Sequence, residues 1–205
     1  VGSDNGFIYS YPRENGSPAG VSPVAFGPIR AQVSIPDSGH VWVTSEDGRV
    51  RCLSGDLKTI LWETDTGAPV RTAPFVLTSN NAVYFTDSAN TIYGLNASNG
   101  SPALGWTANG ARYGASITTS PWADPASGMV AFGTANHMLL ASYLNTPVMP
   151  SDFPLRPAGV KEFTSDPVVL DGVIFVGGAD GRLYSLQRTS GATAPGAGWR
   201  VFDVS

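Results

Sequence analysis

Residues 174–186 read IFVGGADGRLYSL, which is an alternating apolar stretch, a turn and a second alternating stretch. Variants of this segment occur four more times, at 1–11 (VGSDNGFIYSY), 41–53 (VWVTSEDGRVRCL), 83–95 (VYFTDSANTIYGL) and 130–142 (VAFGTANHMLLAS). The shared turn position is occupied by Gly6, Gly48, Asn90, His137 and Gly181, so the copies are 42, 42, 47 and 44 residues apart. Hairpins rich in β-branched and aromatic residues that repeat at this period are typical of propeller blades.

The turns of this repeat carry characteristic dipeptides. Asn5-Gly6, Asp47-Gly48 and Asp180-Gly181 accept positive φ at both central positions of a type I′ turn, so we expect two-residue hairpins of that type. His137 occupies the same position in its copy, and histidine tolerates the left-handed backbone better than most residues.

Two further strands flank each hairpin. Upstream, a short strand with a shared proline occurs at 72–77 (TAPFVL), 119–123 (TSPWA) and 165–170 (SDPVVL), and 29–35 (IRAQVSI) is a divergent version. Downstream, a glycine-containing turn leads to Trp62, Trp106 or Trp199, with Phe26 and Phe153 in place of tryptophan in the other two copies. Each repeat therefore predicts a four-stranded antiparallel blade, and the chain is predicted to be an all-β propeller.

These residues resemble the PQQ-like (quinoprotein-type) β-propeller repeat, in which an apolar strand, a DG turn and a second strand precede a Thr-Gly turn and a tryptophan. Residues 174–186, followed by Ser190, Gly191 and Trp199, match it best. The resemblance implies that Trp62, Trp106 and Trp199 dock between neighbouring blades. A tryptophan suits this role because it buries about 200 Å² and can donate its N–H to a neighbouring backbone.

The repeat boundaries predict blades at 1–28, 29–69, 70–115, 116–162 and 163–205, the first one incomplete because its innermost strand is missing. Propellers of the resembled family have seven or eight blades. We therefore expect the chain to be part of a larger ring, and a compact five-bladed ring is the alternative.

Composition excludes several classes of protein. Only 14% of the 205 residues are charged, the net charge is −4 and no basic run exists, so a nucleic-acid-binding surface is not indicated. No apolar stretch reaches the 18 residues that a membrane-spanning helix needs. The single cysteine, Cys52, excludes a disulfide scaffold and a cysteine-rich metal cluster.

No catalytic pattern remains once the repeat is accounted for. Acidic residues concentrate in the hairpin turns, where aspartate accepts hydrogen bonds from its own backbone, and neither His40 nor His137 has metal-ligand spacing. The quinone-binding members of the resembled family have a vicinal cysteine pair, which one cysteine cannot form. We therefore assign no catalytic, cofactor-binding or metal residues and expect no cofactor.

One group of cations suggests a binding site. Arg30, Arg71, Arg112 and Lys161 all lie in connections that enter innermost strands, so we expect them, with Tyr113, around one mouth of the propeller channel. The alternative is that they are independent surface charges paired with Glu63, Asp65, Glu162 and Asp166. Tyr113, Trp122, Met149 and Phe163 are further candidates to anchor a partner.

We therefore expect a non-catalytic scaffold that presents loops to a protein partner outside the cytoplasm, in the periplasm or secreted, as the resemblance to non-enzymatic members implies. Two alternatives stay open. One is a carbohydrate-binding propeller, and the other is a fragment of a quinoprotein-like dehydrogenase whose catalytic residues lie outside this chain.

Overall fold

The computed structural model describes residues 1–12, 14, 16–17, 19–23, 26–36, 39–156, 162–170, 173–188 and 199–203. Within these residues the fold is all-β, with five antiparallel sheets that we call blades 1 to 5 in chain order. Blade 1 contains β1 (Tyr9–Ser10) and β2 (Gly20–Val21). Blade 2 contains β3 (His40–Thr44), β4 (Arg49–Ser54) and β5 (Ile60–Asp65).

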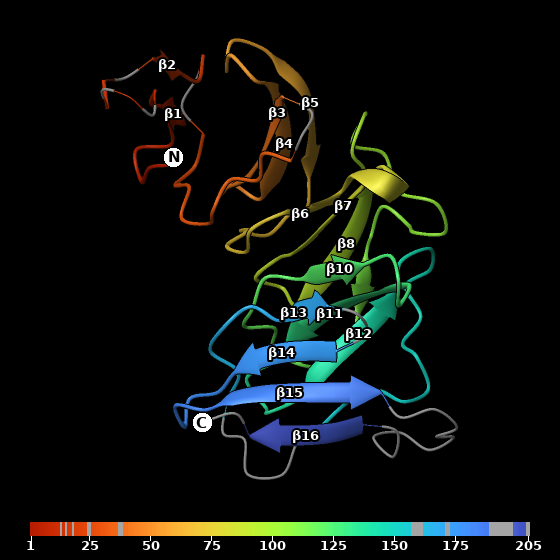
Figure 1. Ribbon diagram of the computed structural model, residues 1–205. Coiled ribbons are helices and arrows are strands. Elements are labelled where there is room, and N and C mark those ends of the chain that lie inside the picture. The colour runs from red at the N-terminus through yellow and green to blue at the C-terminus, as the bar shows by residue number, and fades with distance from the viewer. Residues whose placement is uncertain are drawn as a thin grey trace.

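The other three blades are antiparallel sheets of four, three and four strands in chain order. Blade 3 contains β6 (Phe75–Leu77), the 3-10 turn η1 (Thr78–Asn80), β7 (Ala82–Thr86), β8 (Thr91–Asn96) and β9 (Ala111–Arg112). Blade 4 contains β10 (Trp122–Asp124), β11 (Met129–Gly133) and β12 (Leu139–Tyr143), and blade 5 contains β13 (Val168–Leu170), β14 (Val173–Gly177), β15 (Leu183–Arg188) and β16 (Trp199–Asp203). The blades follow one another along an arc, and β10 contacts both β6 and β13, the first strands of its neighbours (Figure 1).

Each hydrophobic core cluster lies between two consecutive blades. The cluster between blades 2 and 3 joins Trp42 and Trp62 to Val83 and Phe85, and the cluster between blades 3 and 4 joins Tyr84 and Trp106 to Phe132 and Leu140, among others. Similar clusters join blades 1 and 2 and blades 4 and 5. The faces of the sheets are therefore buried against neighbouring sheets, which is the packing of a propeller.

The hairpin turns differ from the expected type I′ form. Positive φ occurs once per turn, at Gly6, Gly48, Asn90, His137 and Gly181, and not at the residue before it. In blade 2 the Gly48 amide donates to Ser45 and the Ser45 amide donates to Arg49, which gives a three-residue loop with its last residue left-handed. This is the type I turn with a bulge, so the prediction of a two-residue loop was wrong although the left-handed position was placed correctly.

In blades 3, 4 and 5 a side-chain hydroxyl accepts a backbone amide beside the innermost strand. Thr72 Oγ1 accepts the amide of Thr86 at 3.0 Å, Thr119 Oγ1 accepts that of Gly133 at 2.7 Å and Ser165 Oγ accepts that of Gly177 at 2.7 Å. These residues stand two places before the shared proline, and they supply the acceptor that the strand end would otherwise lack.

Candidate binding surfaces

The predicted cationic mouth is in part neutralised. Arg30 lies 3.0 Å from Asp4 and 3.1 Å from Glu46, and Arg71 lies 2.8 Å from the same Glu46 oxygen. Two connections that enter different blades are thus brought together at Glu46. Their charges are balanced by Asp4 and Glu46, so these four side chains give no excess of positive charge to attract an anion.

The other members of the predicted mouth are placed differently. Arg112 is exposed in β9 and donates to Thr91 Oγ1 at 2.9 Å, while Lys161 lies outside the described residues. The half-buried Tyr113 donates to Ser142 Oγ at 2.9 Å and packs on Phe132, and burial raises the pKa of its phenol. The binding role assigned to this group stays a prediction.

The acidic partners suggested for those cations pair elsewhere. Glu63 accepts from Arg49 at 2.7 Å and from Arg51 at 3.0 Å, and Asp65 lies 3.5 Å from Arg49. The Arg51 side chain is only 5% exposed and also lies 2.6 Å from Asp47. These ion pairs therefore connect the hairpin turn of blade 2 to its outer strand, β5.

The recurring tryptophans contact the next blade. Trp62 Nε1 donates to the carbonyl of Ala97 in blade 3 at 2.9 Å, and Trp106 Nε1 donates to the carbonyl of Leu144 in blade 4 at 2.9 Å. A β-carbon at Gly94 would lie 2.7 Å from the Trp106 ring, so the indole packs directly on the backbone of its own blade. Trp199 lies in β16, and its side chain is outside the described residues.

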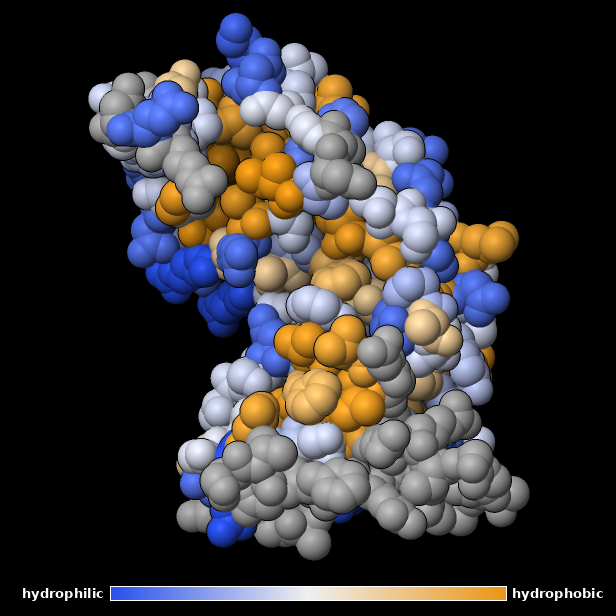
Figure 2. Space-filling model, in the orientation of Figure 1, coloured by the Kyte–Doolittle hydropathy of each residue, from blue (hydrophilic) through white to orange (hydrophobic). Residues whose placement is uncertain are grey.

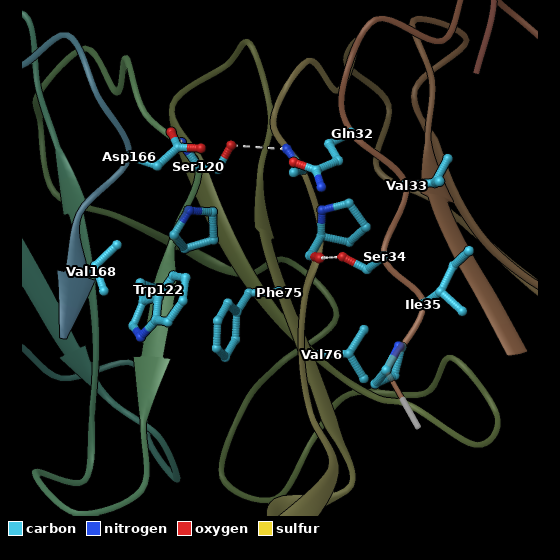
Figure 3. Close-up of a pocket in the computed structure, with 14 residues that line it drawn as sticks. Gln32, Val33, Ser34, Ile35, Phe75, Val76, Ser120, Trp122, Asp166 and Val168 are labelled. Carbon is cyan, nitrogen blue, oxygen red and sulfur yellow. Dashed lines mark hydrogen bonds between the residues drawn. The ribbon is translucent and has the colours of Figure 1, made fainter. Parts of the chain in front are cut away.

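Four successive blades contribute a shallow groove that we call the channel wall, made of residues 32–36, 73–76, 120–122, 166 and 168, with a volume of about 360 Å³ (Figure 3). By strand register Ser34, Phe75, Trp122 and Val168 occupy the same place in their blades. The Phe75 and Trp122 rings lie 4.8 Å apart at 51° and face the groove.

A polar ladder runs along one end of the channel wall. The amide of Ala73 donates to Ser120 Oγ at 3.0 Å, and the amide of Ser120 donates to Asp166 Oδ1 at 2.6 Å. The side chains of Ser120 and Asp166, which precede Pro121 and Pro167, therefore bind the backbone of the preceding blade. Gln32 stands at the same position, with its side chain exposed at the edge of the groove.

The channel wall exposes apolar side chains beside polar ones. Ile35 is 62% exposed and Val168 is 41% exposed. In Figure 2 apolar residues gather over the region where β10 and β13 lie, with hydrophilic residues beside them. Of the suggested anchors Trp122 is on this wall, whereas Phe163 is only 1% exposed and belongs to the core between blades 4 and 5.

Sequence reasoning did not identify Gln32, Phe75 and Asp166 as wall residues. The signal was present in the Thr/Ser-x-Pro motif, since the residue before the proline forms the polar ladder and the residue after it faces the channel.

Acidic groups in the turns bind their own hairpins. Asp87 accepts the Thr91 amide at 2.8 Å and the Tyr93 hydroxyl at 3.0 Å, and Asp180 accepts the Tyr184 hydroxyl. Burial raises the pKa of the Tyr93 hydroxyl to about 12, and the charge of Asp87 contributes to the same shift. Among the described residues no three His, Cys, Asp or Glu side chains are grouped to hold a metal ion.

The residues do not fit the quinone-binding site of the resembled family, which needs two adjacent cysteines. Cys52 is the single cysteine, it is buried, and burial raises the pKa of its thiol to about 11. No helix within the described residues has the length and apolar character needed to cross a bilayer.

Comparison with known proteins agrees with this architecture. The family model described as outer membrane protein assembly factor BamB matches residues 4–146. The crystal structure of BamB from Moraxella catarrhalis is 18% identical with a TM-score of 0.68, and the similarity covers 90% of this chain and 56% of that one. No curated protein sequence matches the chain.

Two computationally designed proteins have the same fold. Ika8 is 17% identical with a TM-score of 0.70, over 90% of this chain and 53% of the designed one, and Ika4 is 17% identical with a TM-score of 0.64, over 83% and 97%. The chain therefore spans little more than half the length of BamB and Ika8.

Proposed function

The chain belongs to the family described as outer membrane protein assembly factor BamB, and from this we propose that it is a non-catalytic propeller scaffold that binds a protein partner outside the cytoplasm. The observation that carries the proposal is the match over residues 4–146 to a family described as an outer membrane protein assembly factor. On the same ground we propose a part in assembling proteins of the outer membrane.

The channel wall is the surface that suits such a partner. Protein interfaces are enriched in aromatic residues at their centre and surround them with polar groups. Phe75 and Trp122 supply the aromatic centre, and Gln32, Ser120 and Asp166 supply the polar edge. A segment of a partner that lies along the groove would bury apolar surface on Val168 and Ile35 as well.

Site-specific cross-linking tests this proposal in the source cells. A photoreactive amino acid at Gln32 is expected to give one discrete protein adduct in the extracytoplasmic fraction, and the adduct is expected to disappear in Trp122→Ala. The matched control is the same photoreactive residue at Leu104, which is 87% exposed and does not line the wall. Recovery of the chain in the cytoplasm, without an adduct from position 32, would contradict the proposal.

A carbohydrate ligand is a second candidate for the same groove. The aromatic pair beside the Gln32 amide and the Asp166 carboxylate offers an apolar platform with a few polar groups, which is the composition of small-ligand sites. A glycan array distinguishes a carbohydrate ligand from a protein partner. Selective binding to glycans that is lost in Trp122→Ala favours a carbohydrate ligand, and absence of binding to any glycan favours the protein partner.

A further inference from the structure

The interface between blades 2 and 3 departs from the interface between blades 3 and 4 at one position. Strand register makes Trp42 in β3 the counterpart of Tyr84 in β7, because Trp42 pairs with Cys52 and Tyr84 pairs with Gly94 at the same place in their hairpins. The same register makes Ala97 the counterpart of Leu144. The Ala97 amide donates to the carbonyl of Asn81, and the Leu144 amide donates to the carbonyl of Gly128.

In the interface between blades 3 and 4 one carbonyl oxygen accepts two hydrogen bonds. The Leu144 oxygen accepts from Trp106 Nε1 at 2.9 Å and from the Tyr84 hydroxyl at 2.9 Å. In the interface between blades 2 and 3 the Ala97 oxygen accepts from Trp62 Nε1 at 2.9 Å, and no hydroxyl of the described residues takes the place of Tyr84. One lone pair of this carbonyl is therefore available, since a carbonyl oxygen accepts two hydrogen bonds.

The tryptophan that replaces tyrosine leaves a donor without a partner. Trp42 is only 3% exposed, and its Nε1 has no hydrogen-bond partner among the described residues. A buried donor of this kind costs free energy unless an acceptor reaches it. Trp42 and Ala97 thus bring an unpaired donor and an available acceptor to the same interface.

A pocket of about 360 Å³ lies at this position. Trp42, Cys52, Val76 and Ala97 form its apolar interior, and His40, Thr78, Asn81 and Ser98 complete its lining with polar groups. Leu61 also lines it and is 47% exposed, so the pocket reaches the protein surface at this residue. An apolar cavity of roughly 150 Å³ is already enough to bind benzene.

We propose that this pocket binds a small phenolic compound whose hydroxyl accepts a hydrogen bond from Trp42 Nε1 and donates one to the carbonyl of Ala97. A hydroxyl is the group that both donates and accepts, and the Tyr84 hydroxyl is its counterpart at the neighbouring interface. The aromatic ring of the ligand packs among Trp42, Val76 and Leu61. The site is separate from the channel wall and does not depend on the scaffold function.

The test follows the indole N–H signals of the ¹⁵N-labelled protein while phenol or toluene is added. Five tryptophans give five signals, and that of Trp42 is assigned by its loss in Trp42→Tyr. Phenol is expected to shift the Trp42 signal downfield and saturably, and toluene is expected to bind about tenfold more weakly, because it lacks the two hydrogen bonds.

Two variants make the test specific. Trp42→Tyr places the hydroxyl of the protein itself where we expect that of the ligand, so phenol affinity, followed through the Trp62 signal, is expected to fall at least about tenfold while the fold is kept. Leu61→Trp is expected to close the mouth and weaken binding without changing the interior. The matched control is Tyr84→Phe, which alters only the neighbouring interface and is expected to leave phenol affinity unchanged.

Three results would overturn the proposal. They are equal affinity for toluene and phenol, unchanged phenol binding in Trp42→Tyr, and a Trp42 signal that does not respond saturably to phenol.

Discussion

Trp62 and Trp106 each donate their indole N–H to a backbone carbonyl of the next blade, but the two carbonyls differ in the number of hydrogen bonds they accept. The Leu144 carbonyl has a second donor, the Tyr84 hydroxyl. Among the described residues the Ala97 carbonyl has a single donor, the Trp62 indole N–H. Loss of the indole N–H therefore leaves Ala97 without a donor and leaves Leu144 with one. The cost of a buried unsatisfied group decides how much each tryptophan contributes.

Replacing each tryptophan by phenylalanine measures this difference. We expect Trp62→Phe to lower the free energy of unfolding by about 1–2 kcal/mol more than Trp106→Phe does, because only the former leaves a buried carbonyl unpaired. Urea denaturation of the two variants under the same conditions gives the comparison. Equal losses would show that ring packing, and not the hydrogen bond, determines the contribution.

Asp47 is the second residue whose contribution can be isolated. Partial burial by itself raises the pKa of its carboxyl, but hydrogen bonds from Arg51 and Ser45, the charge of Arg51 and the Arg49 amide outweigh that effect and lower it. A group whose pKa is lower in the folded state contributes stability above its unfolded pKa of about 3.9, and this contribution is lost as the pH falls through the lowered value.

Asp47→Asn is therefore expected to cost about 1–3 kcal/mol near pH 7 and progressively less below about pH 4. Melting temperatures of the wild-type protein and the variant between pH 7 and pH 2.5 provide the measurement. Glu14→Gln, in an exposed turn, is the control. A difference in stability that does not change with pH would contradict the assigned role of the carboxylate.

At the level of elements, the hydroxyl that accepts a backbone amide in blades 3, 4 and 5 varies in burial from copy to copy. Thr119 is 2% exposed and holds the Gly133 amide, whereas Ser165 is exposed and holds the Gly177 amide. Water can replace an exposed acceptor but not a buried one, so the same contact is expected to have unequal energetic weight in the two blades.

Thr119→Val, which keeps the shape of the side chain, is expected to destabilise the protein by about 1–3 kcal/mol, and Ser165→Ala by less than about 1 kcal/mol. Hydrogen exchange of the Gly133 amide provides a local measurement, because this amide loses its acceptor in Thr119→Val. Unchanged protection of Gly133 would mean that another acceptor replaces the threonine.

At the scale of the whole molecule, each blade packs mainly on its two neighbours. The core clusters each join consecutive blades, and strands more than one blade apart share no such cluster among the described residues. Stability in such an arrangement approximates a sum of blade and interface contributions, as in other repeat proteins.

A change at one interface is therefore expected to remain local. In Trp62→Phe, native-state hydrogen exchange is expected to accelerate in β3–β5 and β6–β9, on both sides of the altered interface, and to stay the same in β13–β15. Mass spectrometry of peptides from these segments measures the effect. Uniform acceleration along the chain would indicate a single cooperative unit.

Much of this architecture could be predicted from the sequence. Period-two alternation, the left-handed turn position and the recurring tryptophan repeat in each copy, and these are local properties of the backbone and of side-chain size. The BamB family match and the fold agree with the all-β propeller and with its PQQ-like repeat. The turn type was missed because the dipeptide Asp-Gly is compatible with more than one hairpin loop.

The sequence by itself determined the repeat, the strand pattern and the family of this protein. The tertiary structure decided which groups meet across blades: Arg30 and Arg71 on one Glu46, Phe75 beside Trp122 in the channel wall, and Trp42 with an unpaired indole beside Ala97. Each of these groups combines residues from neighbouring blades. Their distances depend on how whole sheets pack on one another, which local propensity does not encode.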